Sequence, residues 1–324
     1  MSGLALRREN ENYDHTGHSA HINRPNVVYR VTLISLLVLL SLAQLAPFVI
    51  AVSNSLKCLP ALQAFPESFL PNLPIGVECR TETGVAKSPS ETSGSLFFNP
   101  TIEGYSKVLE LNFLTWFQNS MIYAIGVTVM RLFLDSLAGY ALAKLRFKGN
   151  RLIFVMLLGM MMIPGVVLLI PRFIILQQLG LLNSYVGVFL TLGVDAFGIF
   201  LMKQYFETIP DELIEAAKID GAGPFRTFWS VVLPITRPGL VALAILSFGS
   251  IWNSFIDLLV IVGGKQEMLN LPLGLALLRG QFGETLIWNV FLAGSVITTL
   301  PMVILFFIFQ KQFVSSELQA GMKG

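Results

Sequence analysis

Residues 215–234 read EAAKIDGAGPFRTFWSVVLP, a polar stretch punctuated by prolines that separates two long apolar segments. The segment before it covers roughly residues 184–205 and the segment after it covers residues 238–262. Each is long enough to cross a bilayer as a helix, which takes about 20 apolar residues. An organised polar stretch between two such helices predicts a contact surface for a partner protein.

Composition places the rest of the chain in a membrane as well. Of the 324 residues, 54% are hydrophobic and 13% are charged, and a mean hydropathy of +0.68 is too high for one soluble core. We therefore predict an all-α polytopic membrane protein with six transmembrane helices. The expected spans are residues 31–52, 111–130 with an extension to 143, 152–171, 184–205 with a break at Asp195, 238–262 and 285–310.

An even number of spans puts both termini on one side, and Lys and Arg indicate which side. The tails and the connections at 144–151 and 203–237 hold fourteen of these residues, against seven in the other connections. The positive-inside rule then predicts cytosolic N and C termini. Because the first thirty residues are too polar for a cleaved signal peptide, the first span is expected to stay as an anchor. The expected division is a cytosolic tail (1–29) and a transmembrane domain (30–324) with an external loop (53–112) and a cytosolic element (207–237).

Several classes of function are excluded by what the chain lacks. All three histidines, His15, His18 and His21, lie in the polar tail, where no second shell would fix a metal, so no metal site is expected. A membrane region without histidine excludes Ser-His-Asp and His-metal catalysis there, and no catalytic residue is predicted. The chain has no GxxxxGK[ST] phosphate loop, so ATP would be handled by another polypeptide. A net charge of +2 gives no reason to expect a nucleic-acid partner.

Both cysteines, Cys58 and Cys79, fall in the external loop. A bridge between them would close a loop of about 22 residues and stabilise the fold by roughly 3 kcal/mol in the chain-entropy model. Two free thiols are the alternative, because connectivity does not follow from sequence. The loop itself has no sustained period and is interpreted as a solvated linker or as an irregular cap that docks a partner.

The connection between the fourth and fifth spans has its own helical signals. Thr208 is the expected N-cap of a short helix from Pro210 to Ile219, which Gly221 and Gly223 end. A second helix starts at Pro224 and is expected to end at Leu233-Pro234. Its apolar residues recur at helical spacing on one face, and they are Phe225, Phe228, Trp229 and Val232. The pair, with Glu215 and Lys218 on the first helix, forms either a knob that fits a groove in another protein or an amphipathic element on the lipid interface.

The same residues carry a resemblance to a known family. Glu215-Ala216-Ala217, then Gly221, Val231 and Leu233-Pro234, resemble the EAA signature of the membrane permease subunits of ABC importers, with Val231 at the usual isoleucine. Three further stretches are similar to carbohydrate-uptake permeases, especially the maltose-type second permease subunit: Asn119-Ser120, residues 138–149 (AGYALAKLRFKG) and Trp252-Asn253. The external loop is longer than is usual in that branch.

The resemblance implies a complete transport machine. It implies an ABC importer type I permease fold in a bacterial or archaeal cytoplasmic membrane, paired with a second permease, two cytosolic ATPases and an extracytoplasmic solute-binding protein. ATP and Mg would be used by the ATPases, and this chain would bind no cofactor. The Glu215 carboxylate would contact a groove of the ATPase and Gly221 would permit the turn. The implied ATPase-coupling set is Glu215, Ala216, Ala217, Gly221, Phe225, Leu233 and Pro234.

Polar residues inside the spans are the remaining candidates, because each is costly in hydrocarbon. Arg131 and Asp135 lie four apart and are expected to pair. The expected substrate path for a sugar uses Asn119, Asn253 and Asp257, although a packing contact to the sister subunit explains Asp257 equally well. Other readings stay open. They are a polyamine or phosphate-ester cargo, a self-contained secondary transporter or channel using Asp195 and Asp257 as ion sites, and an intramembrane aspartyl enzyme built on the same two residues.

Overall fold

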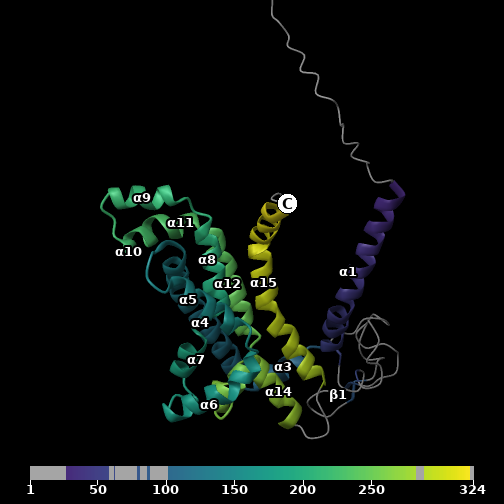
Figure 1. Cartoon of the computed structure of the whole chain (residues 1–324). Helices are drawn as coiled ribbons and strands as arrows, with labels where there is room; N and C mark the ends of the chain where they lie inside the picture. The colour runs from purple at the N-terminus through teal and green to yellow at the C-terminus, as the bar shows by residue number, and fades with distance from the viewer. Residues whose placement is uncertain are drawn as a thin grey trace, which may run out of the picture. The chain divides into compact units, whose positions relative to one another are not determined.

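A computed structural model of the chain describes residues 27–57, 62, 79–80, 86–87, 101–281 and 288–321 (Figure 1). The chain divides into two units, Met1–Phe48 and Val49–Gly324. The predicted tail lies outside the described residues except for residues 27–29, and its three histidines lie outside them too. In the first unit, the described part belongs to α1 (Val27–Ser55), whose apolar side chains are largely exposed, as expected of a helix that faces lipid.

The second unit is helical over nearly all of its described residues. Apart from turns and connections, the described residues also include the short strands β1 (Cys79–Arg80) and β2 (Ala86–Lys87), which pair antiparallel with Cys79 opposite Lys87. The helices are α3 (Glu103–Glu110), α4 (Phe113–Lys144), α5 (Asn150–Met161), η1 (Gly165–Leu168), α6 (Leu169–Gln178), α7 (Tyr185–Leu192), α8 (Ala196–Glu207), α9 (Asp211–Ile219), α10 (Pro224–Thr227), η2 (Phe228–Val232), α11 (Leu233–Ile235), α12 (Arg237–Trp252), α13 (Ile256–Val262), η3 (Gln266–Met268), α14 (Leu271–Gln281) and α15 (Trp288–Gly321).

Length and composition give six candidate spans in the described part of the chain. Three are continuous helices, α1, α4 and α15, and three are bent pairs: α5 with η1–α6, α7 with α8, and α10–α11 with α12. With 32 residues, α4 is about 48 Å long, more than the hydrocarbon thickness of a bilayer. The all-α architecture is therefore confirmed, with up to six spans if each bent pair counts as one span, and the break of the fourth span at Asp195 is confirmed with a bend of 47°.

Two spans expected to be uninterrupted are broken instead. In the third, α5 ends at Met161 and the chain bends by 97° before η1 and α6. Pro164 lies in this break and explains it, because proline disfavours a helical residue before it and cannot donate a backbone hydrogen bond. In the fifth, α12 ends at Trp252, and α13 starts as a separate helix at Ile256.

Two clusters of buried side chains hold the second unit together. The larger cluster lies toward the end of the bundle that carries α6, α7 and α14 in Figure 1, and it includes Trp116, Tyr123 and Trp252. The Trp252 ring stacks on Phe248 at 5.6 Å between centroids. The smaller cluster lies at the opposite end and joins α4 and α8 to the connection of residues 209–232. This second cluster positions the candidate site.

Candidate coupling element and intramembrane polar cluster

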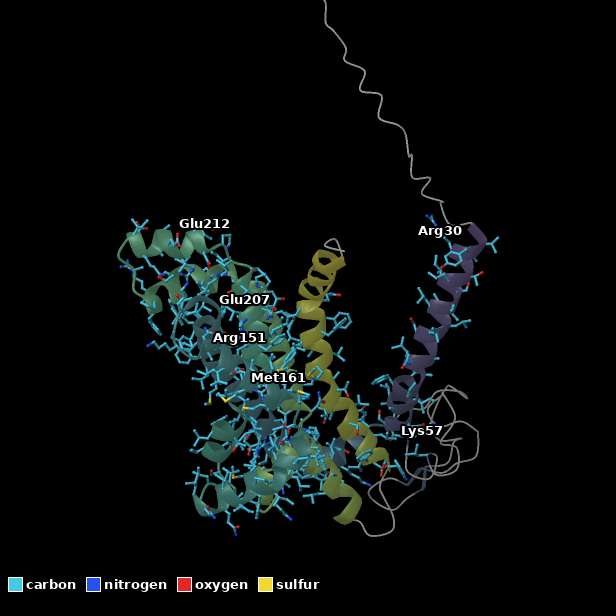
Figure 2. All side chains as sticks on the ribbon, viewed as in Figure 1. Arg30, Lys57, Arg151, Met161, Glu207 and Glu212 are labelled. Carbon is cyan, nitrogen blue, oxygen red and sulfur yellow. The ribbon has the colours of Figure 1, made fainter. Side chains whose placement is uncertain are left out.

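The polar connection forms a compact element at one end of the bundle. In Figure 1, α9, α10 and α11 lie across the ends of the long helices, while α4, α8 and α12 run toward the other end. Figure 2 shows the same order along the bundle, with Glu212 on α9 beyond Glu207 of α8 and Arg151 and Met161 of α5. We call residues 207–237 the coupling element.

The start of α9 is fixed by a lysine from the end of α4. The Lys144 ammonium donates to the Ile209 carbonyl and to the Asp211 carboxylate, both at 2.6 Å, and its side chain is 6% exposed. The hydrogen bond and the charge of Lys144 lower the pKa of Asp211 from its ordinary value. The Asp211 carboxylate therefore stays ionised, and the ion pair persists, at a lower pH than for an ordinary aspartate. Pro210, and not Thr208, is the N-cap residue, because the Thr208 hydroxyl donates back to the Tyr205 carbonyl at the end of α8.

The two faces of α9 have different environments. Ile214 and Ala217 are buried against the bundle, whereas Glu215, Ala216 and Ile219 are exposed on the opposite side. Within the described part of the chain, the Glu215 carboxylate has no hydrogen bond and no ion pair. A charged group and an isoleucine that is 87% exposed therefore face outward together from one short helix.

Gly221 makes the turn that the sequence predicts. Its φ is +76°, in the left-handed region that glycine adopts at little cost. The Ala222 N–H donates to the Ala217 carbonyl at 2.9 Å, and the Gly221 N–H donates to the Lys218 carbonyl at 3.0 Å. This pair of bonds is the Schellman motif, which satisfies carbonyls that the helix end would otherwise leave free.

The second helical run differs from the prediction in two ways. The expected single apolar face is split, since Phe228 and Val232 are buried while Phe225 and Trp229 are 61% and 58% exposed. The run also continues past Leu233-Pro234 to Ile235 before the 83° bend into α12. Packing against α4 and α8 explains the split, because it buries only Phe228 and Val232. A π-helical turn at Phe228–Val232 precedes the proline and accommodates a residue without an N–H, so the run continues. In this run, Leu233 is half-buried and Pro234 is exposed.

Three aromatic rings join the coupling element to the spans. Phe228 of η2 lies 5.2 Å from Tyr140 of α4 and 6.3 Å from Phe206 of α8, measured between ring centroids. Tyr140 and Phe206 meet edge to face at 6.2 Å. Closely packed side chains transmit displacement, so this cluster connects the coupling element mechanically to α4 and α8.

A second polar group lies where the fourth span breaks. The break between α7 and α8 leaves the Leu192 carbonyl and the Asp195 N–H without helical partners. Arg131 Nε donates to that carbonyl at 2.8 Å, and the Asp195 N–H donates to the Asp135 carboxylate at 3.1 Å. The expected Arg131–Asp135 ion pair is wrong, since it is not among the ion pairs of the described residues. Each side chain instead forms a hydrogen bond with a backbone group of the break. Such pairing is needed because an unpaired backbone group is costly inside the bilayer.

The two aspartates considered as ion sites line one cavity beside this break. The cavity is about 340 Å³ in volume, and its polar lining comprises Arg131, Asp195, Ser247, Ser250, Ser254 and Asp257. The Asp195 carboxylate caps α8 by accepting from the Gly198 N–H, and Asp257 forms an ion pair with Arg172 of α6. The Ser254 hydroxyl is buried and has no partner in the described structure.

The other residues assigned to a substrate path are placed differently. Asn119 is 3% exposed, and its amide donates to the carbonyls of Glu267 and Leu269 and accepts from the Tyr185 hydroxyl. Asn119 therefore ties α4 to η3 and α7 and leaves little for a solute. Asn253 is exposed at the end of α12, where its amide donates to the Gly249 carbonyl. The predicted stripe along one helix from Asn253 to Asp257 is interrupted by the break before α13.

The packing of α8 against α4 provides a stability test. A Cβ added at Gly198 would lie 2.2 Å from an Asp135 carboxylate oxygen and 3.1 Å from a Leu243 methyl group. We expect Gly198→Ala to destabilise the folded protein by about 1–3 kcal/mol through overpacking. The matched control is Gly159→Ala in α5, whose added methyl meets nothing within 4 Å and should raise stability slightly, by up to about 1 kcal/mol, because alanine favours a helix. Thermal unfolding in detergent measures both, and equal melting temperatures would contradict the packing argument.

The cysteine prediction falls partly outside the described residues. Cys79 begins β1, but Cys58 lies outside the described part of the chain, so the bridge stays a prediction. We expect a membrane-impermeant maleimide to label intact cells only after reduction. Labelling without reductant would rule the bridge out, and a Cys58→Ser variant should make Cys79 reactive under both conditions.

Lys144 and the aromatic cluster are the functional candidates that sequence reasoning missed. The sequence assigned Lys144 to topology and Tyr140 to an extended second span, and it placed Phe206 one residue beyond the expected fourth span. The partners of Lys144 lie 65 and 67 residues further along the chain, so local spacing gave no signal. The one available hint was that Lys144 and Tyr140 both lie in the 138–149 stretch.

Comparison with known proteins adds independent findings. A family model described as "Binding-protein-dependent transport system inner membrane component" matches residues 135–316. The arabinooligosaccharides transport system permease protein AraQ of Bacillus subtilis (strain 168) is 33% identical over 301 residues, covering 92% of this chain and 97% of that protein. The trehalose/maltose transport system permease protein MalG of Thermococcus litoralis is 34% identical over 232 residues, covering 70% and 83%.

A solved structure agrees in fold. A chain from a bacterial ABC transporter involved in the import of the acidic polysaccharide alginate superposes with a TM-score of 0.71 at 23% identity. The match covers 89% of this chain and 97% of that chain.

Proposed function

Because the chain belongs to the family of binding-protein-dependent transport system inner membrane components, we propose that it is a permease subunit of an ATP-driven importer for a sugar or oligosaccharide. It is a multi-pass membrane transport subunit and not an enzyme. The sugar cargo is supported by relatives whose names specify arabino-oligosaccharides and trehalose or maltose. We infer that the protein lies in a bacterial or archaeal cytoplasmic membrane with both termini in the cytosol.

The observation that carries the coupling role is the exposed surface of the coupling element. Glu215, Ile219, Phe225 and Trp229 are exposed there, while the buried faces of the same helices pack on α4 and α8. Aromatic side chains that lie exposed in the isolated subunit, beside a charged group, are typical of a surface that becomes buried in a protein interface. We infer that one of two cytosolic ATPase subunits docks on this surface, and that a second permease and an extracytoplasmic solute-binding protein complete the importer.

The contacts of the element suggest how a movement of the ATPase reaches the membrane. Closure of the ATPase subunits on ATP would displace α9–α11. The movement would be felt by α4 and α8, because Lys144 of α4 holds the start of α9 and Phe228 lies between Tyr140 and Phe206. Displacement would then pass to α4 and α8, which frame the polar break of the fourth span. The inward-open and outward-open states are two packings of these helices, and nucleotide binding shifts the population between them.

The cavity beside the break is the part of this chain best suited to meet a solute. Its serines and Asp257 offer hydroxyl and carboxylate oxygens, which match the several hydroxyl groups of a sugar. We infer that Asp257 contributes to the path from this cavity, with Asn253 near its edge, whereas Asn119 supports the fold around it.

Uptake measurements test the proposal. Cells lacking the gene should lose ATP-dependent uptake of one labelled oligosaccharide, and the full-length gene in trans should restore it. Uptake of labelled polyamine and glycerol phosphate in the same cells distinguishes the other cargoes. Proteoliposomes that contain this chain alone should transport none of the solutes. Transport by the isolated chain would overturn the proposal in favour of a secondary transporter.

A further inference from the structure

The connection between α4 and α5 carries more positive charge than the fold uses. Residues 144–151 read KLRFKGNR, with four basic residues among eight. Lys144 is consumed by its contacts with Ile209 and Asp211. Arg146, Lys148 and Arg151 are exposed, and in the described structure none of them has a hydrogen bond or an ion pair. Three exposed cations without an ion pair of their own therefore lie within residues 146–151, and of these Arg146 also acts on the Asp211 carboxylate through its charge.

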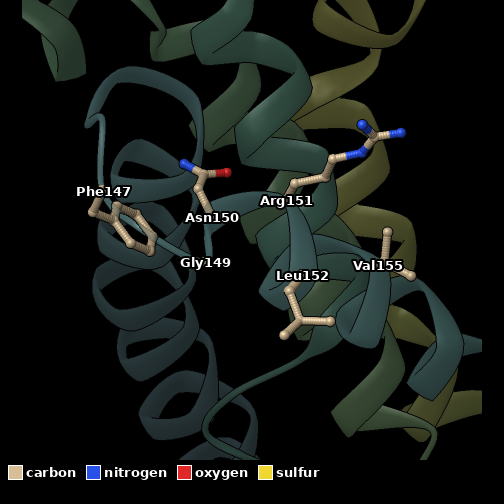
Figure 3. A pocket seen from close by; sticks show the side chains of 6 residues that line it. All are labelled: Phe147, Gly149, Asn150, Arg151, Leu152 and Val155. Carbon is tan, nitrogen blue, oxygen red and sulfur yellow. The ribbon is translucent and has the colours of Figure 1, made fainter.

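Arg151 also lines an open pocket with apolar walls, and Arg146 and Lys148 flank Phe147, another residue of its lining, along the chain. The pocket has a volume of about 730 Å³ and is lined by Phe147, Gly149, Asn150, Arg151, Leu152 and Val155. Figure 3 shows the Phe147 ring on the connection and the Leu152 side chain on α5, with the Arg151 side chain directed away from Leu152. Phe147, Leu152 and Val155 are 42%, 63% and 56% exposed, so the walls are apolar surfaces that no residue in the described part of the chain covers.

The pocket is held in shape by the backbone around it. The Asn150 amide donates to the carbonyls of Leu142 and Leu145 at 3.0 and 3.2 Å, which fixes the connection against the end of α4. Gly149 has a φ of +93°, and the space around it is open. A ligand that enters meets a preformed recess and does not pay to order a loop.

The position of the pocket selects the ligand. Arg151 is the last charged residue before the uncharged run 152–171, so the pocket lies where the third span enters the hydrocarbon. Its two parts match an amphiphile, since the exposed Phe147, Leu152 and Val155 suit acyl chains and the three cations suit an anionic group. Basic pockets at the cytoplasmic ends of transmembrane helices attract anionic lipids in this way. We propose that the α4–α5 connection is a binding site for an anionic phospholipid, with Arg146, Lys148 and Arg151 holding the headgroup phosphate.

Site-specific photocrosslinking tests the proposal. The full chain carries p-benzoylphenylalanine in place of Phe147 and is placed in nanodiscs of equal phosphatidylglycerol and phosphatidylcholine. The lipid captured at position 147 is then identified by mass spectrometry. One basic residue contributes about fivefold in relative affinity at low salt, so we expect phosphatidylglycerol to exceed phosphatidylcholine by at least about tenfold. Millimolar inorganic phosphate should not reduce this excess, because the apolar walls give free phosphate no advantage.

Two variants separate the site from general surface charge. Replacing Arg146, Lys148 and Arg151 together by glutamine should bring the capture ratio to about one. The matched control removes three charges from the same side of the membrane, at Lys218, Arg226 and Arg237, and should keep the excess of phosphatidylglycerol. Raising the salt concentration about tenfold should reduce the excess of captured phosphatidylglycerol when all three basic residues are present. Salt screens their attraction for the headgroup and leaves the topology of the protein unchanged.

Three outcomes would overturn the proposal. They are equal capture of the two lipids by the unaltered basic site, an excess that survives the loss of all three charges, and, in native membranes, capture of a protein subunit in place of lipid. The test makes no use of cargo or ATP, so its failure would leave the transport function untouched.

Discussion

Charge reversal at Glu215 is expected to reduce ATP-driven uptake by about 100-fold or more while the subunit still folds and inserts. The carboxylate is exposed on the outer face of α9 and has no partner within the described chain, so removing it costs the isolated subunit nothing. In a docked ATPase groove the same group would be desolvated and paired. Losing one partner of such a pair costs about 2–5 kcal/mol, and lysine adds repulsion to any arginine that faces it.

The measurement combines sugar uptake with a check on folding and a control variant. Uptake of labelled sugar in cells that carry Glu215→Lys gives the functional loss, and the melting temperature of the purified variant should equal that of the unaltered protein. Glu110→Lys reverses an exposed charge at the end of α3, away from the coupling element, and should leave co-purification of the ATPase unchanged. Full uptake by Glu215→Lys would remove this residue from the interface.

Loss of the Phe228 ring is the second change with a large expected effect. Phe228 is 1% exposed and packs between Tyr140 and Phe206, at the junction of the coupling element with α4 and α8. Removing a buried phenylalanine side chain costs about 3–5 kcal/mol, because the transfer energy is lost and a cavity remains. We expect Phe228→Ala to lower the melting temperature by about 10 °C and to break the mechanical path to the spans.

A neighbouring phenylalanine supplies the matched control. Phe225 lies in the same helical run but is 61% exposed, so Phe225→Ala should leave the melting temperature unchanged. Its effect should appear instead in ATPase docking, measured by co-purification of the ATPase with the membrane subunit. If both variants melted alike, the division of the aromatic face into a buried and an exposed half would be wrong.

Local patterns were sufficient for the elements of this fold. Long apolar runs predicted the spans, because a helix of about 20 predominantly apolar residues is more stable in lipid than in water. Glycine at 221 predicted the end of α9, because the left-handed turn depends on that residue and its immediate neighbours. Asp195 predicted the break in the fourth span, because a charge that also caps α8 acts within one turn.

Positional detail followed less well from local patterns. The third span was expected to be continuous, although Pro164 was visible inside it, because transmembrane helices often tolerate proline where neighbouring helices re-satisfy the backbone. The second helical run was expected to end at Leu233-Pro234, and the π-helical turn that carries it to Ile235 leaves no pattern in composition.

What the sequence by itself determined was the membrane class, the order of the apolar segments and the family signature, because these depend on hydropathy and on residues close along the chain. The side of each connection stays a prediction from charge. Only the tertiary structure decided which half of the aromatic face is buried, that Lys144 fixes the start of α9, and that Arg131 and Asp135 serve the break in the fourth span and not each other. Most of these outcomes depend on groups about 60 residues or more away along the chain, and the contact of Phe228 with Phe206 joins residues 22 apart. Local spacing specifies which side chains a helix offers, and the packing of distant helices specifies which partners they meet.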